Sequence, residues 1–192
     1  LGGAPIPVVV LLMSALVFAM SCYMAVTGLL IARSAPKSDA IRWLLVMPAI
    51  WVLVEWLRGW FLTGFPWLSL GYSQTNTPLG AWAPVLGVHG VSWVCALLAG
   101  LIVCGLRGRP RQGFAALGGI VFIMLLSLQL QSIRWTTPRA ASLNISLVQA
   151  AIPQELKWSP AQREPTLEFY RDTTLALQDQ DLVIWPEAAI PA

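Results

Sequence analysis

The sequence predicts a polytopic α-helical membrane bundle followed by the start of an α/β domain. Of the 192 residues, 57% are hydrophobic and only 11% are charged, whereas about a quarter of a soluble domain is charged. Charge also divides the chain: residues 1–137 hold eight Lys/Arg and two acids (net +6), and residues 138–192 hold four Lys/Arg and seven acids (net −3). So little charge cannot cover a soluble surface. The basic residues are scattered, so no nucleic-acid partner is expected.

Four apolar stretches predict membrane-spanning helices, at residues 5–32, 43–61, 81–106 and 113–133. Each has roughly the 20 residues that a helix needs to cross the hydrocarbon core, and the first is too long for a signal peptide. In the third stretch, small residues recur at every fourth position, at Ser92, Ala96 and Gly100. Such a stripe predicts close packing against a neighbouring helix.

Few ionisable residues lie within these stretches. Glu55 and Arg58 are three positions apart near the end of the second stretch; they predict an interfacial ion pair on one helix face, with an intramembrane ionisable site as the alternative. His89 is predicted to be a hydrogen-bonded packing residue. Three cysteines lack metal-ligand spacing and are expected to be inert buried thiols, at Cys22, Cys95 and Cys104,. The sequence therefore predicts no metal site and no cofactor.

The loops between the stretches indicate the topology. Residues 33–42 and 107–111 carry three Lys/Arg each, and residues 63–80 carry none. The positive-inside rule places both basic loops in the cytoplasm, so residues 63–80 and the acidic C-terminal part are expected on the other side. The 63–80 segment is uncharged and rich in turn formers. It is predicted to lie in the membrane interface, with Trp67 and Tyr72 at headgroup level.

The region 138–192 has the pattern of a strand, a helix and a second strand, which is the opening of an α/β domain. Residues 143–149 begin with strand-like alternation, and residues 181–185 form a short apolar strand ended by Pro186,. Between them, the Ser-x-x-Gln pattern at Ser159 predicts a capping box and a helix that reaches about residue 178,. Pro165 is expected to disturb this helix or to mark its true start.

Glu187 is the first candidate for catalysis. It follows the second strand directly, and active sites of α/β sheets gather at the carboxyl ends of strands. A carboxylate held there is suited to act as a general base. The alternative is an exposed loop carboxylate without a role in chemistry.

Several motifs together resemble the apolipoprotein N-acyltransferase family. They are Glu55-Trp-Leu-Arg-Gly-Trp60, Thr63-Gly-Phe-Pro-Trp-Leu68, Gly71-Tyr-Ser-Gln74, Val148-Gln-Ala-Ala-Ile-Pro-Gln-Glu-Leu-Lys-Trp158 and Leu182-Val-Ile-Trp-Pro-Glu-Ala-Ala-Ile-Pro191. The resemblance runs in matching order from about residue 43 to the end of the chain. Before that point, the first stretch fits only as an unspecific hydrophobic helix.

The resemblance implies a fold and an activity. It implies a multi-pass protein of the bacterial inner membrane, with a membrane region at 1–137 and the beginning of a periplasmic nitrilase-like α-β-β-α domain at 138–192. The implied reaction moves an acyl chain from a phospholipid to the N-terminal diacylglyceryl-cysteine of an apolipoprotein, through a thioester acyl-enzyme. The implied partners are therefore the phospholipid donor, the apolipoprotein acceptor and the bilayer, with the enzyme as a monomer.

The resemblance also assigns site residues. Glu187 matches the general base of the family's Glu-Lys-Cys triad, and Trp67 and Trp158 match two tryptophans associated with substrate binding. For each Trp the alternative is an interfacial anchor or a packing residue. The family's Lys and Cys fall beyond Ala192, so the chain is expected to be a fragment that is inactive alone.

Two other functions stay open at this point. A membrane-anchored nitrilase-type amidase would share Glu187 and the fold but transfer the acyl group to water. A non-enzymatic transporter or scaffold module would account for the four spans, although the spans offer few polar residues for a pathway.

Overall fold

The computed structural model describes residues 5–34, 36, 38–61, 64–138, 142–153, 156–187 and 189–190. The chain divides into a helical unit, Val10–Thr136, and a second unit that comprises Leu1–Val9 and Thr137–Ala192. We call the part of the second unit from Thr137 onward the C-terminal unit. A few residues of the motifs above lie outside the described residues: Thr63, Gln154, Glu155, Ala188 and Pro191.

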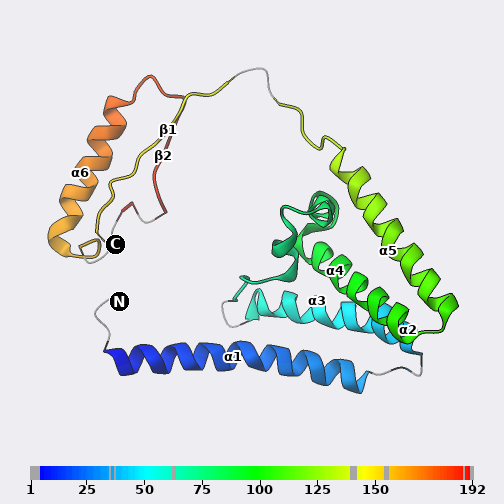
Figure 1. Cartoon of the computed structure of the whole chain (residues 1–192). Helices are drawn as coiled ribbons and strands as arrows, with labels where there is room; N and C mark the ends of the chain where they lie inside the picture. The colour runs from blue at the N-terminus through cyan, green and yellow to red at the C-terminus, as the bar shows by residue number, and fades with distance from the viewer. Residues whose placement is uncertain are drawn as a thin grey trace. The chain divides into compact units, whose positions relative to one another are not determined.

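Within the described residues, four helices are long and apolar enough to cross a membrane, in agreement with the predicted helical bundle (Figure 1). The first is α1 and the last is α5; the second joins α2, a π-helical turn η1 and α3, and the third joins the 3₁₀ turn η4 to α4. Their bounds are α1 Ile6–Arg33, α2 Asp39–Ile41, η1 Arg42–Val46, α3 Met47–Arg58, η4 Pro78–Trp82, α4 Ala83–Arg107 and α5 Pro110–Gln131.

The third span differs from its prediction because it is not one continuous helix. Gly87 interrupts α4 with φ 67° and ψ −177°, so the backbone kinks there. Glycine adopts this left-handed φ without the steric penalty that a side chain would bring. The segment before α4 is also more regular than predicted, because it contains η4 and a second 3₁₀ turn, η3 (Leu70–Gln74).

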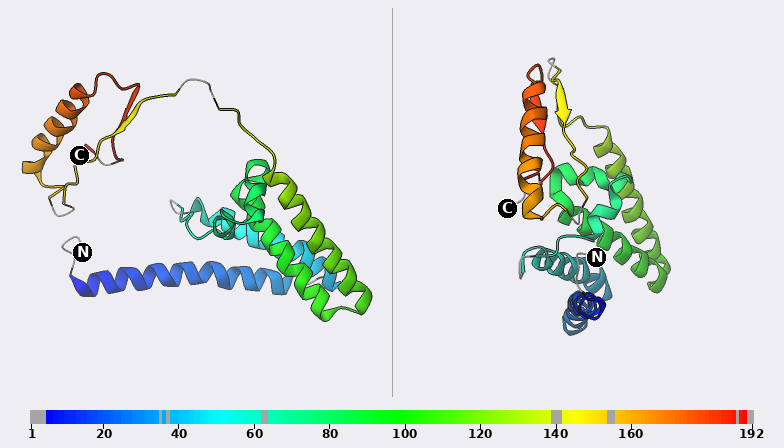
Figure 2. Two further views of the ribbon diagram at one scale, coloured as in Figure 1. Left: turned by 45° about the horizontal axis from the view of Figure 1, so that its top comes forward. Right: turned by 90° about the vertical axis from the view of Figure 1, so that its left-hand side faces the viewer.

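Helix α4 lies between α3 and α5 at the centre of the helical unit (Figure 2). The small-residue stripe of Ser92, Ala96 and Gly100 is buried, as predicted. A Cβ atom at Gly100 would collide with the carbonyl oxygen of Trp43. The backbones therefore approach so closely that only glycine fits, which confirms the packing role of the stripe.

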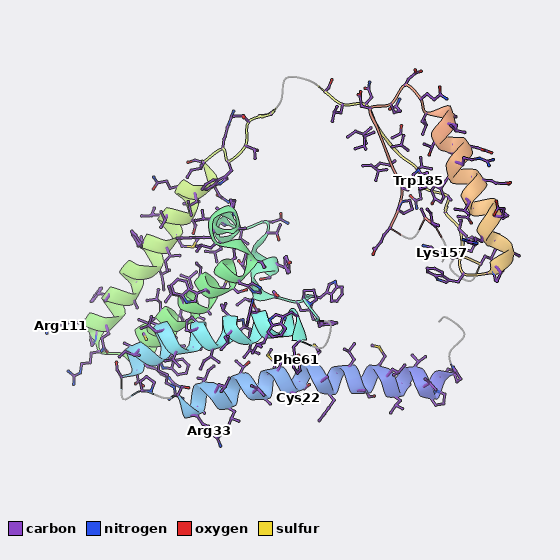
Figure 3. All side chains as sticks on the ribbon, turned by 180° about the vertical axis from the view of Figure 1, so that it is seen from behind. Cys22, Arg33, Phe61, Arg111, Lys157 and Trp185 are labelled. Carbon is purple, nitrogen blue, oxygen red and sulfur yellow. The ribbon has the colours of Figure 1, made fainter. Side chains whose placement is uncertain are left out.

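Helix α1 keeps most of its apolar side chains on the outside of the helical unit. Thr27 is buried where α1 meets α3, but Cys22 is exposed on the helix surface (Figure 3). The prediction of three buried thiols is thus wrong for Cys22, while Cys95 and Cys104 are partly buried. The physical reason is that an apolar residue in a membrane helix gains by facing lipid as well as protein.

The C-terminal unit contains β1 (Ile145–Leu147), α6 (Pro160–Ala176) and β2 (Leu182–Ile184). The strands pair in parallel, with Ser146 opposite Val183. Parallel neighbours require a crossover connection, and α6 provides it. The core of the unit consists of Val148, Tyr170 and Ala189.

Two details of this unit differ from the predictions. Ser159 is the N-cap of α6, with Pro160 in the first turn as predicted, but its side chain makes no capping hydrogen bond. Instead, the N–H of Gln162 donates to the main-chain carbonyl of Ser159 at 2.9 Å. Pro165 lies inside α6 and does not mark its start. It costs the helix one backbone hydrogen bond, close to the end where donors are already unpaired.

Candidate functional site

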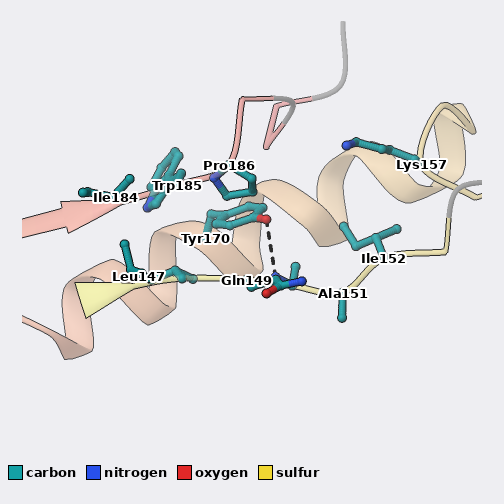
Figure 4. A pocket seen from close by; sticks show the side chains of 11 residues that line it. Leu147, Gln149, Ala151, Ile152, Lys157, Tyr170, Ile184, Trp185 and Pro186 are labelled. Atoms are coloured by element: carbon teal, nitrogen blue, oxygen red, sulfur yellow. Dashed lines mark hydrogen bonds between the residues drawn. The ribbon is translucent and has the colours of Figure 1, made fainter. Parts of the chain in front are cut away.

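The C-terminal unit has a hollow at the carboxyl ends of its two strands, where active sites of α/β sheets form. Its volume is about 360 Å³, and residues that follow β1 and β2 line it together with Tyr170 and Lys157 (Figure 4). The lining residues are Leu147, Val148, Gln149, Ala150, Ala151, Ile152, Lys157, Tyr170, Ile184, Trp185 and Pro186. The hollow is therefore largely apolar, with one ammonium group at its wall.

Hydrogen bonds and ring contacts fix the floor of this hollow. Tyr170 projects from α6, is buried, and accepts a hydrogen bond from the N–H of Ala150 at 3.4 Å. Its ring lies 5.1 Å from that of Trp185, whose indole N–H donates to Thr174 at 3.0 Å. Ala151, on the wall, has a φ of 50°. Non-glycine residues adopt this backbone conformation at a cost that neighbouring contacts must offset.

Glu187 follows the last residue that lines the hollow. It lies in a turn after β2 and its side chain is exposed. The N–H of Ala189 donates to the carbonyl of Pro186 at 3.0 Å and closes this turn. The turn therefore fixes the backbone of Glu187 at the carboxyl edge of the sheet and leaves its carboxylate free to meet a ligand.

Trp158 lies in the turn before α6 and is 57% exposed. The Lys157 ammonium lies 5.9 Å from the centre of its ring, a distance at which a cation–π attraction operates. Lys157 lines the hollow, whereas Trp158 does not. Sequence reasoning did not single out Tyr170, whose only signal was its position on the predicted helix. It included Lys157 in the motif of residues 148–158 but gave it no role at the site.

Trp67 belongs to the helical unit, in the segment of residues 64–74 that follows α3. This segment, which we call the aromatic segment, exposes Trp67 by 63% and Tyr72 by 58%. The two rings at its start, Phe65 and Trp67, are 5.1 Å apart. Large exposed aromatic side chains at the end of a membrane helix are typical of the membrane–water interface.

The aromatic segment is bonded to the charged pair at the end of α3, and this corrects the predicted ion pair. Glu55 accepts hydrogen bonds from the N–H of Leu70 at 2.7 Å and from the indole of Trp51 at 3.1 Å. Arg58 donates to the hydroxyl of Ser69 at 3.5 Å. In the part of the chain that the structure describes, the only ion pair is Arg171 with Asp172. Glu55 and Arg58 thus bind the folded-back segment instead of each other.

A second hollow, of about 210 Å³, lies under the aromatic segment. Glu55, Ser69, Tyr72 and His89 line it together with Trp56 and Trp60. The Nδ1 atom of His89 is buried without a hydrogen-bond partner among the described residues. The prediction that His89 is a hydrogen-bonded packing residue is therefore wrong for this atom.

The two units thus hold different parts of the predicted site. Glu187 and Trp158 belong to the C-terminal unit, and Trp67 belongs to the helical unit. Among the residues that line the hollow of the C-terminal unit, none carries a thiol or hydroxyl nucleophile except the phenol of Tyr170. No group of His, Cys, Asp and Glu residues suited to a metal ion occurs within the described ranges.

The family of this chain follows from its match to a protein-family model. The model described as apolipoprotein N-acyltransferase N-terminal domain matches residues 1–101. The chain belongs to the apolipoprotein N-acyltransferase family. It is 43% identical over 174 residues to the apolipoprotein N-acyltransferase of Methylococcus capsulatus, a match covering 90% of this chain and 34% of that protein.

Two further members of the apolipoprotein N-acyltransferase family match the whole chain. The proteins of that name from Photobacterium profundum and Vibrio cholerae are 41% and 40% identical to it over 192 residues. The chain covers 37% of each of them, so it spans little more than a third of the length of these curated relatives. Membership of this family and the four apolar helices among the described residues together indicate that the chain belongs to a membrane-bound protein.

Proposed function

We propose that this chain is part of an enzyme that acylates the N-terminus of lipoproteins. The acyl donor is a phospholipid and the acceptor is the α-amino group of a diacylglyceryl-cysteine. One observation carries the proposal: a chain with about 40% identity to named apolipoprotein N-acyltransferases over its full length holds Glu187 at the carboxyl edge of a parallel strand pair, next to an apolar hollow.

The proposed reaction has two steps. Glu187 takes the proton of a cysteine thiol, the thiolate attacks the ester carbonyl of the phospholipid, and the lysophospholipid leaves with a proton. The acceptor amine then attacks the thioester, an amide forms, and the thiolate leaves and regains its proton. Splitting the transfer in this way replaces one difficult step by two easier ones.

The thiol and the lysine that supports the tetrahedral intermediate are proposed to come from sequence beyond Ala192, as the resemblance implies. Lys157 precedes Glu187 and matches no catalytic position of the family, and the three cysteines of the chain lie in its membrane helices. In this proposal, residues 138–192 begin a nitrilase-like catalytic domain. They supply the base but not the nucleophile, so they do not acylate alone.

Trp158 and Trp67 are proposed to contact the substrates. Trp158 is exposed beside the apolar hollow of the C-terminal unit, and Trp67 is exposed on the aromatic segment at the end of a membrane helix. Both substrates keep their acyl chains in the bilayer, so the chemistry must take place near headgroup level. Aromatic side chains with one polar edge suit that depth.

The proposed location is the bacterial inner membrane, with the C-terminal unit on the periplasmic side and the enzyme acting as a monomer. The basic residues support this orientation. Arg33 at the end of α1 and Arg111 near the start of α5 lie at the same end of the helical unit (Figure 3). The positive-inside rule assigns that end to the cytoplasm.

Intact mass spectrometry of the full-length protein tests the proposed reaction. After incubation with a phospholipid of known acyl chains, we expect a mass gain of one acyl group. Hydroxylamine should remove the adduct, and the Glu187→Gln variant should not form it. A folded full-length protein that never gains this mass would contradict a covalent route. An adduct that water removes as fast as an acceptor peptide does would favour an amidase.

A further inference from the structure

Two buried side chains hold the aromatic segment by accepting hydrogen bonds from successive backbone N–H groups. The N–H of Leu70 donates to the Glu55 carboxylate at 2.7 Å, and the next N–H, of Gly71, donates to the Ser92 hydroxyl at 2.8 Å. Glu55 is only 4% exposed and Ser92 is fully buried. Because Glu55 lies on α3 and Ser92 lies on α4, the segment is bonded to two helices at one point.

The segment is also held at its beginning. The N–H of Phe65 donates to the carbonyl of Arg58 at 2.7 Å, and the guanidinium of Arg58 reaches the hydroxyl of Ser69. Gly71 lies so close to α4 that a Cβ atom there would collide with the carbonyl oxygen of Val88. The segment therefore cannot shift along α4 without breaking these contacts.

The residues between the two fixed points project outward. Trp67 is 63% exposed and Leu68 is 82% exposed. Leu68 has a φ of 64°, in the left-handed region that a branched side chain seldom adopts,. A strained residue persists only where the surrounding contacts determine its conformation. The hydrogen bonds on either side of Trp67 and Leu68 provide such contacts.

The burial of Glu55 is unfavourable unless its contacts offset the free energy of desolvation. A carboxylate buried in protein loses its hydration, and one of its oxygens, Oε2, has no partner among the described residues,. Buried irregular backbone is tolerated only where other groups satisfy its N–H groups. The contacts of Glu55 are donors from backbone and indole, so the bonds observed need an acceptor oxygen rather than a negative charge.

We infer that Glu55 and Ser92 are positioning residues that hold the aromatic segment so that Trp67 and Leu68 meet the acyl chains of the substrates. Glu55 does this as a hydrogen-bond acceptor and not as an ionisable group. The inference rests on the proposed function for its link to acyl transfer. The holding of the segment itself rests on the contacts alone.

The test combines hydrogen exchange and kinetics on the full-length protein in phospholipid nanodiscs. Glu55→Gln keeps an acceptor oxygen and removes the charge, whereas Glu55→Leu removes both. We expect Glu55→Gln to exchange and react like the wild type. Glu55→Leu and Ser92→Ala should exchange the amides of residues 69–72 roughly tenfold to a hundredfold faster, as the loss of a buried hydrogen bond implies. They should also raise the KM for the phospholipid more than they lower kcat.

Ser127→Ala is the matched control. Ser127 is another fully buried serine in the helical unit, and its hydroxyl accepts from the indole of Trp82 in η4 at 2.8 Å rather than from an N–H of the aromatic segment. This variant should leave exchange at residues 69–72 unchanged. If Glu55→Leu does not fold, Ser92→Ala and Glu55→Gln still test the holding role.

The inference fails if Glu55→Gln is as inactive as Glu55→Leu while the exchange of the segment stays at the wild-type rate. That result would make Glu55 an intramembrane ionisable group. Unchanged exchange in both Glu55→Leu and Ser92→Ala would refute the holding role. If the wild-type protein itself transfers no acyl group, the proposed function fails, and the exchange data still confirm or refute the holding role.

Discussion

At the scale of single residues, truncation of the exposed Trp67 side chain should affect activity more than stability. Its large exposure means that truncation removes little packing, and surface substitutions usually change stability by less than about 0.5 kcal/mol. We expect Trp67→Ala to lower acyl transfer by the full-length protein about tenfold or more, because small losses of substrate position cost large factors in rate. Thermal unfolding and acyl transfer, measured on the same sample, check this. Equal losses of folded protein and of activity would contradict it.

Glu187 gives a second prediction at this scale. Glu187→Gln keeps the size of the side chain and removes the base, so acyl-enzyme formation should fall by roughly 10²–10⁴. The melting temperature should stay unchanged because the side chain is exposed. Glu168→Gln is the control, since Glu168 is an exposed carboxylate on α6. Similar rates of acyl-enzyme formation in the two variants would contradict the role of Glu187 as the general base.

Sequence reasoning failed at the residue scale where a side chain bonds to a distant part of the backbone. The three-residue spacing of Glu55 and Arg58 predicted a pair along one helix. The actual partner of Glu55 is the N–H of Leu70, fifteen positions away. Helix periodicity describes neighbours on one helix, but it carries no information on a segment that folds back. The stripe of Ser92, Ala96 and Gly100 was predictable because it obeys that periodicity.

At the scale of elements, the existence of the membrane helices and of the two strands followed from apolar runs, whereas the breaks in the helices did not. The Gly87 kink and the 3₁₀ turns before α4 depend on backbone geometry that a single apolar run does not encode. The capping box at Ser159 was wrong because a motif names the residues able to cap and does not fix their rotamers. Burial of charged residues, as at Glu55, likewise depends on tertiary contacts.

A prediction at the element scale concerns the close contact at Gly100. Gly100→Ala should destabilise the helical unit by about 1–3 kcal/mol, because overpacking shifts the backbone where the Cβ would meet Trp43,. Gly118→Ala is the matched control: it lies in α5 with nothing within 4 Å of its Cβ. It should be neutral or stabilise by about 0.5–1 kcal/mol, since alanine is the better helix former. Unfolding in detergent measures both, and equal effects would contradict the close packing.

At the scale of the whole molecule, the distribution of charge and the order of the spans together predict a topology. The helical unit presents Arg33 and Arg111 at one end, and its fourth span is followed by a region with seven acids and four basic residues. The positive-inside rule predicts that both basic loops lie on the cytoplasmic side and that the region after the fourth span lies on the other side.

Reporter fusions test this topology. Alkaline phosphatase needs disulfides that form in the periplasm, whereas green fluorescent protein serves as the cytoplasmic reporter. Fusions after Thr75 and after Gln178 should show phosphatase activity and no fluorescence, and fusions after Ser34 and after Gly108 should show the reverse. Replacing all the Lys/Arg of the two basic loops by Gln should weaken this pattern, because the loops would lose the charge that retains them. A phosphatase-active fusion after Gly108 in the unmodified sequence would place the basic loops in the periplasm. That result would contradict the periplasmic position proposed for Glu187.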